Sequence, residues 1–105
     1  MIINEPNLDN KLIKNKNYRD AGNNSNLLIA IKNNSIELVN YFLNKRYNLN
    51  DVNKKGQTSL HLACELGNED IINLLVENGP NTEIRDNKER KPFDYLLINI
   101  FIFFN

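Results

Sequence analysis

Residues 56–79 read GQTSLHLACELGNEDIINLLVENG, and the sequence before them repeats part of this pattern at an offset of 33 residues. Four identities carry the repeat: Leu27 with Leu60, Ala30 with Ala63, Asn40 with Asn73 and Asn48 with Asn81. Self-similarity at this period indicates stacked helix-turn-helix units, because each unit buries its apolar face only against its neighbours. The chain is therefore read as a repeat protein.

The composition limits the classes of partner. A chain of 105 residues has room for one small domain. Its 13 basic side chains balance 13 acidic ones, so no overall field draws the protein to nucleic acid or to an anionic membrane. We predict that the chain binds neither nucleic acid nor a membrane surface, and that any electrostatic attraction to a partner comes from a local group of charges.

The cysteine content and the N-terminus indicate the compartment. Cys64 is the only cysteine, which excludes a disulfide framework and a zinc-binding thiolate cluster and favours a reducing environment. The first 20 residues lack the continuous apolar run of a signal peptide. We predict an intracellular location, in the cytoplasm, with the nucleus left open.

Each copy of the repeat predicts two helices. A short first helix is expected at residues 26–31 and again at 59–66. The second helix of each copy has apolar residues at the i, i+1, i+4, i+5 spacing of one helical face. These residues are the predicted core: Leu38, Val39, Phe42 and Leu43 in one copy, and Ile71, Ile72, Leu75 and Val76 in the next.

The helix ends follow turn chemistry. Gly67 and Gly79 can adopt the positive φ of a helix C-terminus, and Asn68 can cap the helix that follows. In the earlier copy these glycine positions hold Asn34 and Arg46. Since Arg tolerates left-handed geometry poorly, the earlier copy is expected to be the looser one.

A third copy begins at Asp86 and places Pro92 and Phe93 where Ser59 and Leu60 stood. It then becomes an apolar run over residues 96–104, too short for the roughly 20 residues of a membrane-spanning helix. We expect no second helix in this copy. The run either folds over the exposed face of the last unit or remains from a longer protein, and if uncovered it favours self-association.

The motif Thr58-Ser59-Leu60-His61-Leu62-Ala63, followed by Gly67 and by residues 71–79, resembles the ankyrin repeat family. The resemblance implies an all-α solenoid of antiparallel helix pairs with projecting hairpin loops, without a catalytic centre or cofactor. It divides the chain into an N-terminal segment (1–19), repeats at 20–52 and 53–85, a partial repeat (86–97) and an apolar tail (98–105).

The resemblance also implies structural roles for four residues of the second repeat. Thr58 and His61 are expected to form hydrogen bonds at the start of the first helix, and Gly67 and Gly79 to end the two helices. The third repeat departs from the family pattern, because Lys91 stands where the family has threonine and so removes a cap.

Two kinds of chemistry compete with this interpretation. Cys64 follows His61 by about one helical turn, a spacing that can bring a nucleophile and a base together. Glu69, Asp70 and Glu77 are candidate metal ligands. A core position for Cys64 and a solvated helix start for the acidic residues require fewer assumptions. We therefore predict that the chain is not an enzyme and holds no metal or cofactor.

In the ankyrin family, partners contact the hairpin tips and the exposed side of the first helices. The corresponding residues here are Lys54, Lys55, Gln57, Glu65, Leu66, Asn87, Lys88 and Arg90. The basic residues of these two loops are hypothesised to form a basic strip that binds an acidic or phosphorylated protein surface: Lys54, Lys55, Arg85, Lys88, Arg90 and Lys91. The alternative is that these charged side chains lie on solvated loops and bind no partner.

The predicted function is that of a non-catalytic protein-binding module. The alternative is a structural one, in which a fragment of a larger repeat protein associates with itself through the apolar tail and an uncapped C-terminal face.

Overall fold

A computed structural model describes the backbone of residues 15–104 and the side chains of residues 15–102. The helices are α2 (Asn26–Lys32), α3 (Ile36–Leu43), α4 (Ser59–Leu66), α5 (Glu69–Glu77) and α6 (Asp94–Phe104). No strand occurs in this part of the chain. The all-α prediction is confirmed.

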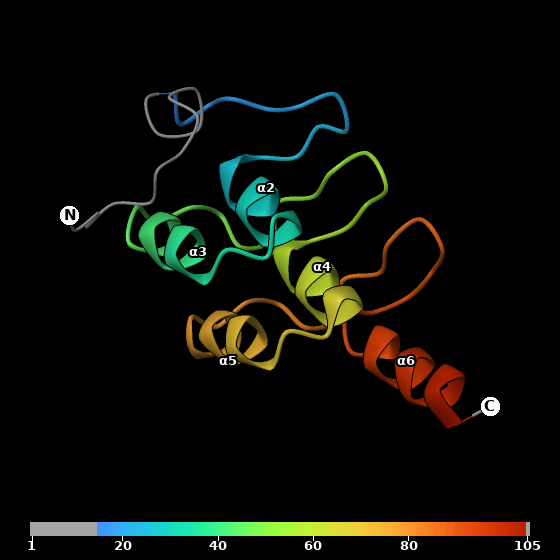
Figure 1. Ribbon diagram of the computed structural model, residues 1–105. Helices are drawn as coiled ribbons and strands as arrows, with labels where there is room; N and C mark the ends of the chain where they lie inside the picture. Colours follow the sequence, from blue (N-terminus) through green and yellow to red (C-terminus); the bar gives the residue numbers. More distant parts are fainter. Residues whose placement is uncertain (1–14, 105) are drawn as a thin grey trace.

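The helices form two layers (Figure 1). Within each unit the two helices pack together, α2 with α3 and α4 with α5. Between units the first helices α2, α4 and α6 stack in one row, and α3 stacks on α5 in the other. The loops between units project to one side of the first-helix row (Figure 1). This arrangement is the predicted helix-turn-helix solenoid.

A side chain caps the start of each of the helices α2, α3, α4 and α5. The capping oxygens belong to Ser25, Ser35, Thr58 and Asn68. Each accepts a hydrogen bond from the backbone amide three residues later, which satisfies a donor that has no partner inside the helix. The predicted Asn68 cap is confirmed.

Left-handed residues follow the helices at equivalent positions in the two copies. Gly67 and Gly79 have φ of 73° and 71°, and Asn34 and Arg46 have φ of 57° and 61°. The space around a Cβ at either glycine is open, so backbone conformation alone accounts for these glycines. The first copy adopts the same turns with less suitable residues.

The core lies between the two layers and continues from unit to unit. It is formed mainly by Leu27, Leu28, Ala30, Ile31, Leu38, Val39, Phe42, Leu60, Ala63, Cys64, Ile71 and Leu75. Val76, predicted as core, is instead 43% exposed. Its counterpart Leu43 is half-buried. The difference arises because α5 stacks on α3, whereas no described helix stacks on the far side of α5.

The apolar tail was expected to begin at residue 98, but α6 runs through that point without a break. Residues 98–104 extend the first helix of the third unit instead of folding back over it. The helix continues because Ile100 occupies the position of Asn34 and Gly67. A β-branched residue strongly disfavours the left-handed backbone that ends α2 and α4.

Candidate functional site

The three projecting loops share one turn, built on Asp20, Asn53 and Asp86 at 33-residue spacing. In each, a side-chain oxygen accepts hydrogen bonds of 2.9–3.0 Å from the backbone amides two and four residues later. The left-handed residue of each turn lies three positions on, at Asn23, Gly56 and Glu89. Each loop is therefore a hairpin held by its own first side chain.

Hydrogen bonds join the hairpin tips to one another. The Lys54 amide donates to the Gly22 carbonyl at 3.0 Å, and the Asn87 amide donates to the Lys55 carbonyl at 2.9 Å. The Asn87 side-chain amide also donates to the Lys54 carbonyl at 2.9 Å. At Gly56, where φ is 74°, an added Cβ would lie 2.6 Å from the Asn87 side-chain oxygen and 3.1 Å from its backbone nitrogen, so both the backbone conformation and the close approach favour glycine.

A groove of about 390 Å³ lies between these tips and the first helices of the first two units. The groove residues are Gly22, Asn24, Lys32, Asn53, Lys54, Lys55, Gln57, Leu62, Glu65 and Leu66. Five of them were predicted as partner contacts: Lys54, Lys55, Gln57, Glu65 and Leu66. Stacking thus brings part of the predicted set together, and it adds Lys32 and Leu62, which sequence reasoning did not identify.

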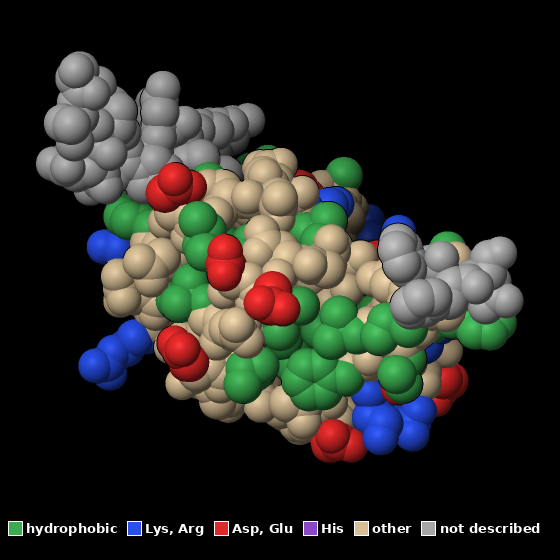
Figure 2. Space-filling model, turned by 60° about the horizontal axis from the view of Figure 1, so that its bottom comes forward, with side chains coloured by type: hydrophobic (Ala, Val, Ile, Leu, Met, Phe, Trp, Pro, Cys, Tyr) green, Lys and Arg blue, Asp and Glu red, His purple; other side chains and the backbone are tan. Residues whose placement is uncertain are grey.

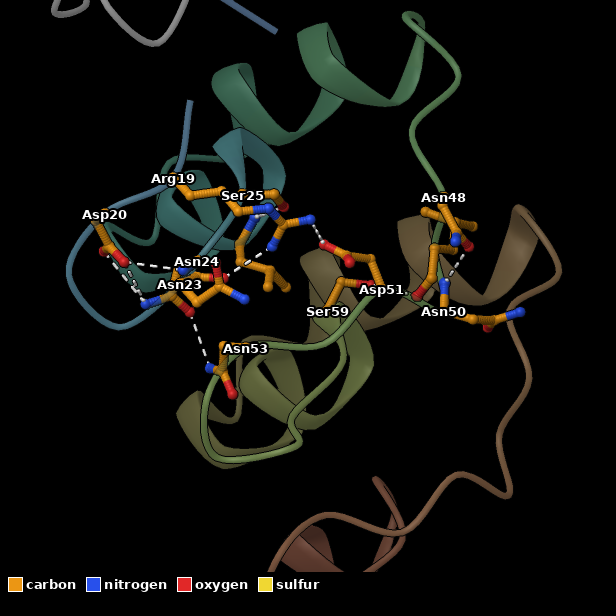
Figure 3. Close-up of polar contacts among 12 residues, drawn as sticks. Arg19, Asp20, Asn23, Asn24, Ser25, Asn48, Asn50, Asp51, Asn53 and Ser59 are labelled. Atoms are coloured by element: carbon orange, nitrogen blue, oxygen red, sulfur yellow. Dashed lines mark hydrogen bonds and ion pairs between the residues drawn. The ribbon is translucent and has the colours of Figure 1, made fainter. Parts of the chain in front are cut away.

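Buried amide side chains that line the groove form its floor, a polar network that links the first two hairpins. Figure 3 shows the Asp20, Asn24 and Asn53 part of this network. The Asn24 side chain donates to Asp20, and Asn53 donates to Asn24 at 2.8 Å and to Gln57 at 3.2 Å. Gln57 in turn donates to Glu65 at 3.2 Å. Gln57 is only 6% exposed, so its amide serves the network more than the groove surface.

The rim of the groove is positively charged. Lys32, Lys54 and Lys55 are exposed, and no described carboxylate forms an ion pair with them. The ion pairs within the described residues lie elsewhere and join Arg19 to Asp51 and Lys91 to Glu83. Among the residues that line the groove, three lysines therefore outnumber the single carboxylate, Glu65.

Asp20 lies next to this rim. Burial raises the pKa of its carboxyl, but hydrogen bonds from Asn24 and the Gly22 amide, together with the Lys32 charge, bring the pKa below its usual value. The carboxylate therefore stays ionised near neutral pH, where it holds the first hairpin in shape.

The remaining predicted contacts belong to the third hairpin and do not line the groove. Lys88 is exposed at its tip. Arg90 is half-buried, and its guanidinium lies 5.5 Å from the centre of the Tyr95 ring, in a cation–π contact. The Asn87 amide joins the hairpins, as described above. The third hairpin thus extends the edge of the surface.

Thr58 and His61 form the start of α4. The Thr58 amide donates to His61 Nδ1 at 3.0 Å, and the His61 amide donates to the Thr58 hydroxyl at 3.2 Å. His61 Nε2 lies 2.8 Å from the Arg90 carbonyl, which can only accept. The ring proton therefore lies on Nε2, which connects the second unit to the third, whereas Nδ1 accepts within the second unit.

Cys64 does not form a nucleophile and base pair with this histidine. It is fully buried, and burial raises the pKa of its thiol to about 11. A buried neutral thiol beside a histidine with both nitrogens engaged cannot provide a reactive thiolate. In the described residues no group of three or more His, Cys, Asp or Glu side chains is placed to hold a metal ion.

The helices of the described part are all too short, or not apolar enough, to span a bilayer.

The chain matches the sequence profile of ankyrin repeats (3 copies) over residues 3–86. It is 30% identical over 83 residues to alpha-latroinsectotoxin-Lt1a of Latrodectus tredecimguttatus, a match covering 79% of this chain and 6% of the toxin. It is 33% identical over 64 residues to glycerophosphocholine phosphodiesterase GDE1 of Candida albicans, with 58% of this chain and 6% of that protein covered.

A further match is to human ankyrin repeat and SOCS box protein 13, with 45% identity over 42 residues, 40% of this chain and 15% of that protein. The chain thus spans only a small part of the length of these curated relatives, which include an enzyme. The profile match, the 33-residue period and the stacked helix pairs lead to one conclusion: this chain belongs to the ankyrin repeat family.

Proposed function

We propose that this chain is a non-catalytic protein-binding module whose partner lies across the hairpin tips and the exposed side of the first helices. The observation that carries the proposal is the groove between the first two units, with its unpaired lysine rim. Ankyrin repeats are generally protein interaction modules, and a concave site with an apolar wall and a few placed charges is typical of binding sites.

The charges of the rim define the partner further. A partner with an acidic surface would be drawn to Lys32, Lys54 and Lys55 and, at the edge, to Lys88. Rim charges mainly govern the rate and specificity of association, so binding should weaken as salt concentration rises. The charge balance of the whole chain adds no competing long-range attraction.

The test is a selection of binders from a displayed library of protein fragments with the full chain as bait. The groove variant reverses two charges, Lys54→Glu with Lys55→Glu. A matched control reverses two charges after α3, Lys45→Glu with Arg46→Glu. Binders that lose affinity only for the groove variant support the proposal. Binders equally affected by both variants, or by neither, overturn it.

A second candidate function is self-association through the outer face of α6 and α5. Four side chains of α6 are more than half exposed: Leu97, Ile100, Phe101 and Ile102. Figure 2 shows hydrophobic side chains gathered on this side of the molecule. A contiguous exposed apolar patch is typical of an interaction surface. We propose a second copy of the chain as its occupant.

Sedimentation velocity over a concentration series tests this candidate. We expect the sedimentation coefficient to rise with concentration, and Leu97→Glu with Phe101→Glu to abolish that rise. The groove variant described above serves as the control, since its charges lie on another face. A coefficient independent of concentration for the unmodified chain would rule out self-association.

A further inference from the structure

We infer that the groove binds an extended acidic segment of the partner in which an apolar residue is flanked by carboxylates. This inference rests on the proposed function and specifies its ligand. The apolar residue would contact α4, and the carboxylates would meet the lysine rim.

The wall of the groove is apolar. Leu62 and Leu66 lie one turn apart on α4 and both line the groove. Leu62 is 6% exposed, whereas Leu66 is 48% exposed. Leu66 thus has apolar surface left to cover, and Leu62 forms the base beneath it. An apolar ligand side chain placed here would remove that surface from water.

The rim supplies three separate positive charges. Lys32 lies in the last turn of α2, while Lys54 and Lys55 are adjacent at the second hairpin tip. Ammonium groups are compact point charges without the planar fork by which Arg holds a single carboxylate or phosphate. Lysines from two elements around one groove therefore suit several carboxylates spaced along a segment.

The floor restricts where those carboxylates can lie. The amides of Asn24, Asn53 and Gln57 are already engaged with one another and with Asp20 and Glu65. Glu65 is exposed on α4 beside Leu66 and repels a carboxylate placed near it. The segment should therefore place an apolar residue against α4 and its acids toward the lysines, which disfavours a uniformly charged polyanion.

The experiment is a titration of the ¹⁵N-labelled full chain with three synthetic peptides, followed by amide chemical shifts. The probes are acetyl-Glu-Glu-Leu-Glu-Glu-amide, the same peptide with Ser in place of Leu, and acetyl-Lys-Lys-Leu-Lys-Lys-amide. Inorganic phosphate is titrated separately. We expect the acidic Leu peptide to shift amides at Lys32, Lys54, Lys55 and Leu66, with the weakest effects on α5.

Two variants make the result specific. Lys54→Glu with Lys55→Glu should weaken the acidic Leu peptide about tenfold, and high salt should weaken it similarly. Leu66→Ser should remove the preference for Leu over Ser in the peptide, because it removes the apolar contact. The spectrum of each variant is recorded first, and the signal dispersion of a folded protein is the condition for interpreting lost binding as an effect on the groove.

Four outcomes would overturn the inference: equal binding of the basic peptide, equal binding of the Ser peptide, shifts confined to other faces, or phosphate alone reproducing the acidic peptide's shifts and affinity. If the library selection yields groove-dependent binders while the acidic Leu peptide fails, the ligand inference is wrong and the proposed function stands. If both fail, both are wrong.

Discussion

Arg46 has a left-handed backbone, with φ of 61°, at the position that Gly79 occupies in the next unit. A side chain with a Cβ is strained in this region, whereas glycine is not. We predict that Arg46→Gly raises the free energy of unfolding by about 1 kcal/mol, because relief of strain exceeds the added flexibility of the unfolded chain. Urea unfolding followed by circular dichroism measures the change.

Asn44→Gly is the matched control for this change. Asn44 lies two residues earlier with φ of −70°, so glycine there adds flexibility to the unfolded chain and relieves no strain. The control should lower stability. If Arg46→Gly also lowered the free energy of unfolding, left-handed strain at Arg46 would not be what limits the stability of the first copy.

Asp86 connects stability to pH. Burial raises the pKa of its carboxyl, but hydrogen bonds from the Tyr95 hydroxyl and the Arg90 and Lys88 amides outweigh this and bring the pKa below its usual value. Because the folded pKa is lower than the unfolded one, the unfolded state binds more protons. This stabilisation is complete above the unfolded pKa and is lost as pH falls through the folded pKa.

Asp86→Asn removes this titration and keeps the turn, since Asn53 makes the same pair of amide bonds in the second hairpin. We predict that the variant is less stable than the unmodified chain at about pH 7 and that the difference shrinks at about pH 3. Urea unfolding at both pH values tests this. A difference that does not change with pH would show that the charge of Asp86 contributes nothing to stability.

At the scale of elements, the start of α6 differs from that of α4. Thr58 and His61 exchange two hydrogen bonds at the start of α4. Their counterparts in the third unit are Lys91 and Asp94. Only one of the two hydrogen bonds is kept there, from the Lys91 amide to the Asp94 carboxylate at 2.8 Å. The first hydrogen bonds of α6 run from the amide of residue i+3 to the carbonyl of residue i, the tighter 3₁₀-type winding that is frequent at helix ends.

Lys91→Thr should restore the missing cap. We predict that Lys91→Thr is more stable than Lys91→Ala by about 1 kcal/mol, the usual contribution of a threonine cap. Alanine is the reference because both variants lose the exposed ion pair between Lys91 and Glu83. Urea unfolding of the two variants gives the difference, and equal stabilities would mean that α6 gains nothing from capping.

At the scale of the whole molecule, stability should be highest in the middle of the stack. Helix α4 contacts α2, α5 and α6, whereas the main helix contact of α6 is with α4. In repeat proteins each unit is stabilised by its neighbours, so a unit with one neighbour opens more readily. We predict that native-state hydrogen exchange is slowest for the amides of α4 and fastest for the last turns of α6.

Mass spectrometry or NMR of exchanging amides measures this order. The exchange experiment is done at low protein concentration, because self-association through α6 would itself slow the exchange of the α6 amides. Equal protection of α4 and α6 at the lowest concentration would contradict a stack whose stability depends on its neighbours.

Much of the fold could be predicted from the sequence because helix caps and turns depend on residues that are close together in the chain. Helix caps such as Asn68 and turn residues such as Gly67 act on backbone groups within four residues, so their effect can be predicted from the neighbouring sequence. The 33-residue identities then predicted stacking, because each apolar face needs a neighbour. The Asn and Asp residues of the three hairpins have the same period, a signal that sequence reasoning did not use.

Sequence by itself therefore determined the helices, the turns that separate them and the family. Only the tertiary structure decided that Val76 is exposed, that α6 continues past residue 98, and that Lys32 lies in one groove with Lys54 and Lys55. The physical reason is the separation along the chain of the residues that interact. Hydrogen bonds of caps and turns join near neighbours in the chain, whereas burial and grooves depend on which surfaces of successive units meet and which stay uncovered.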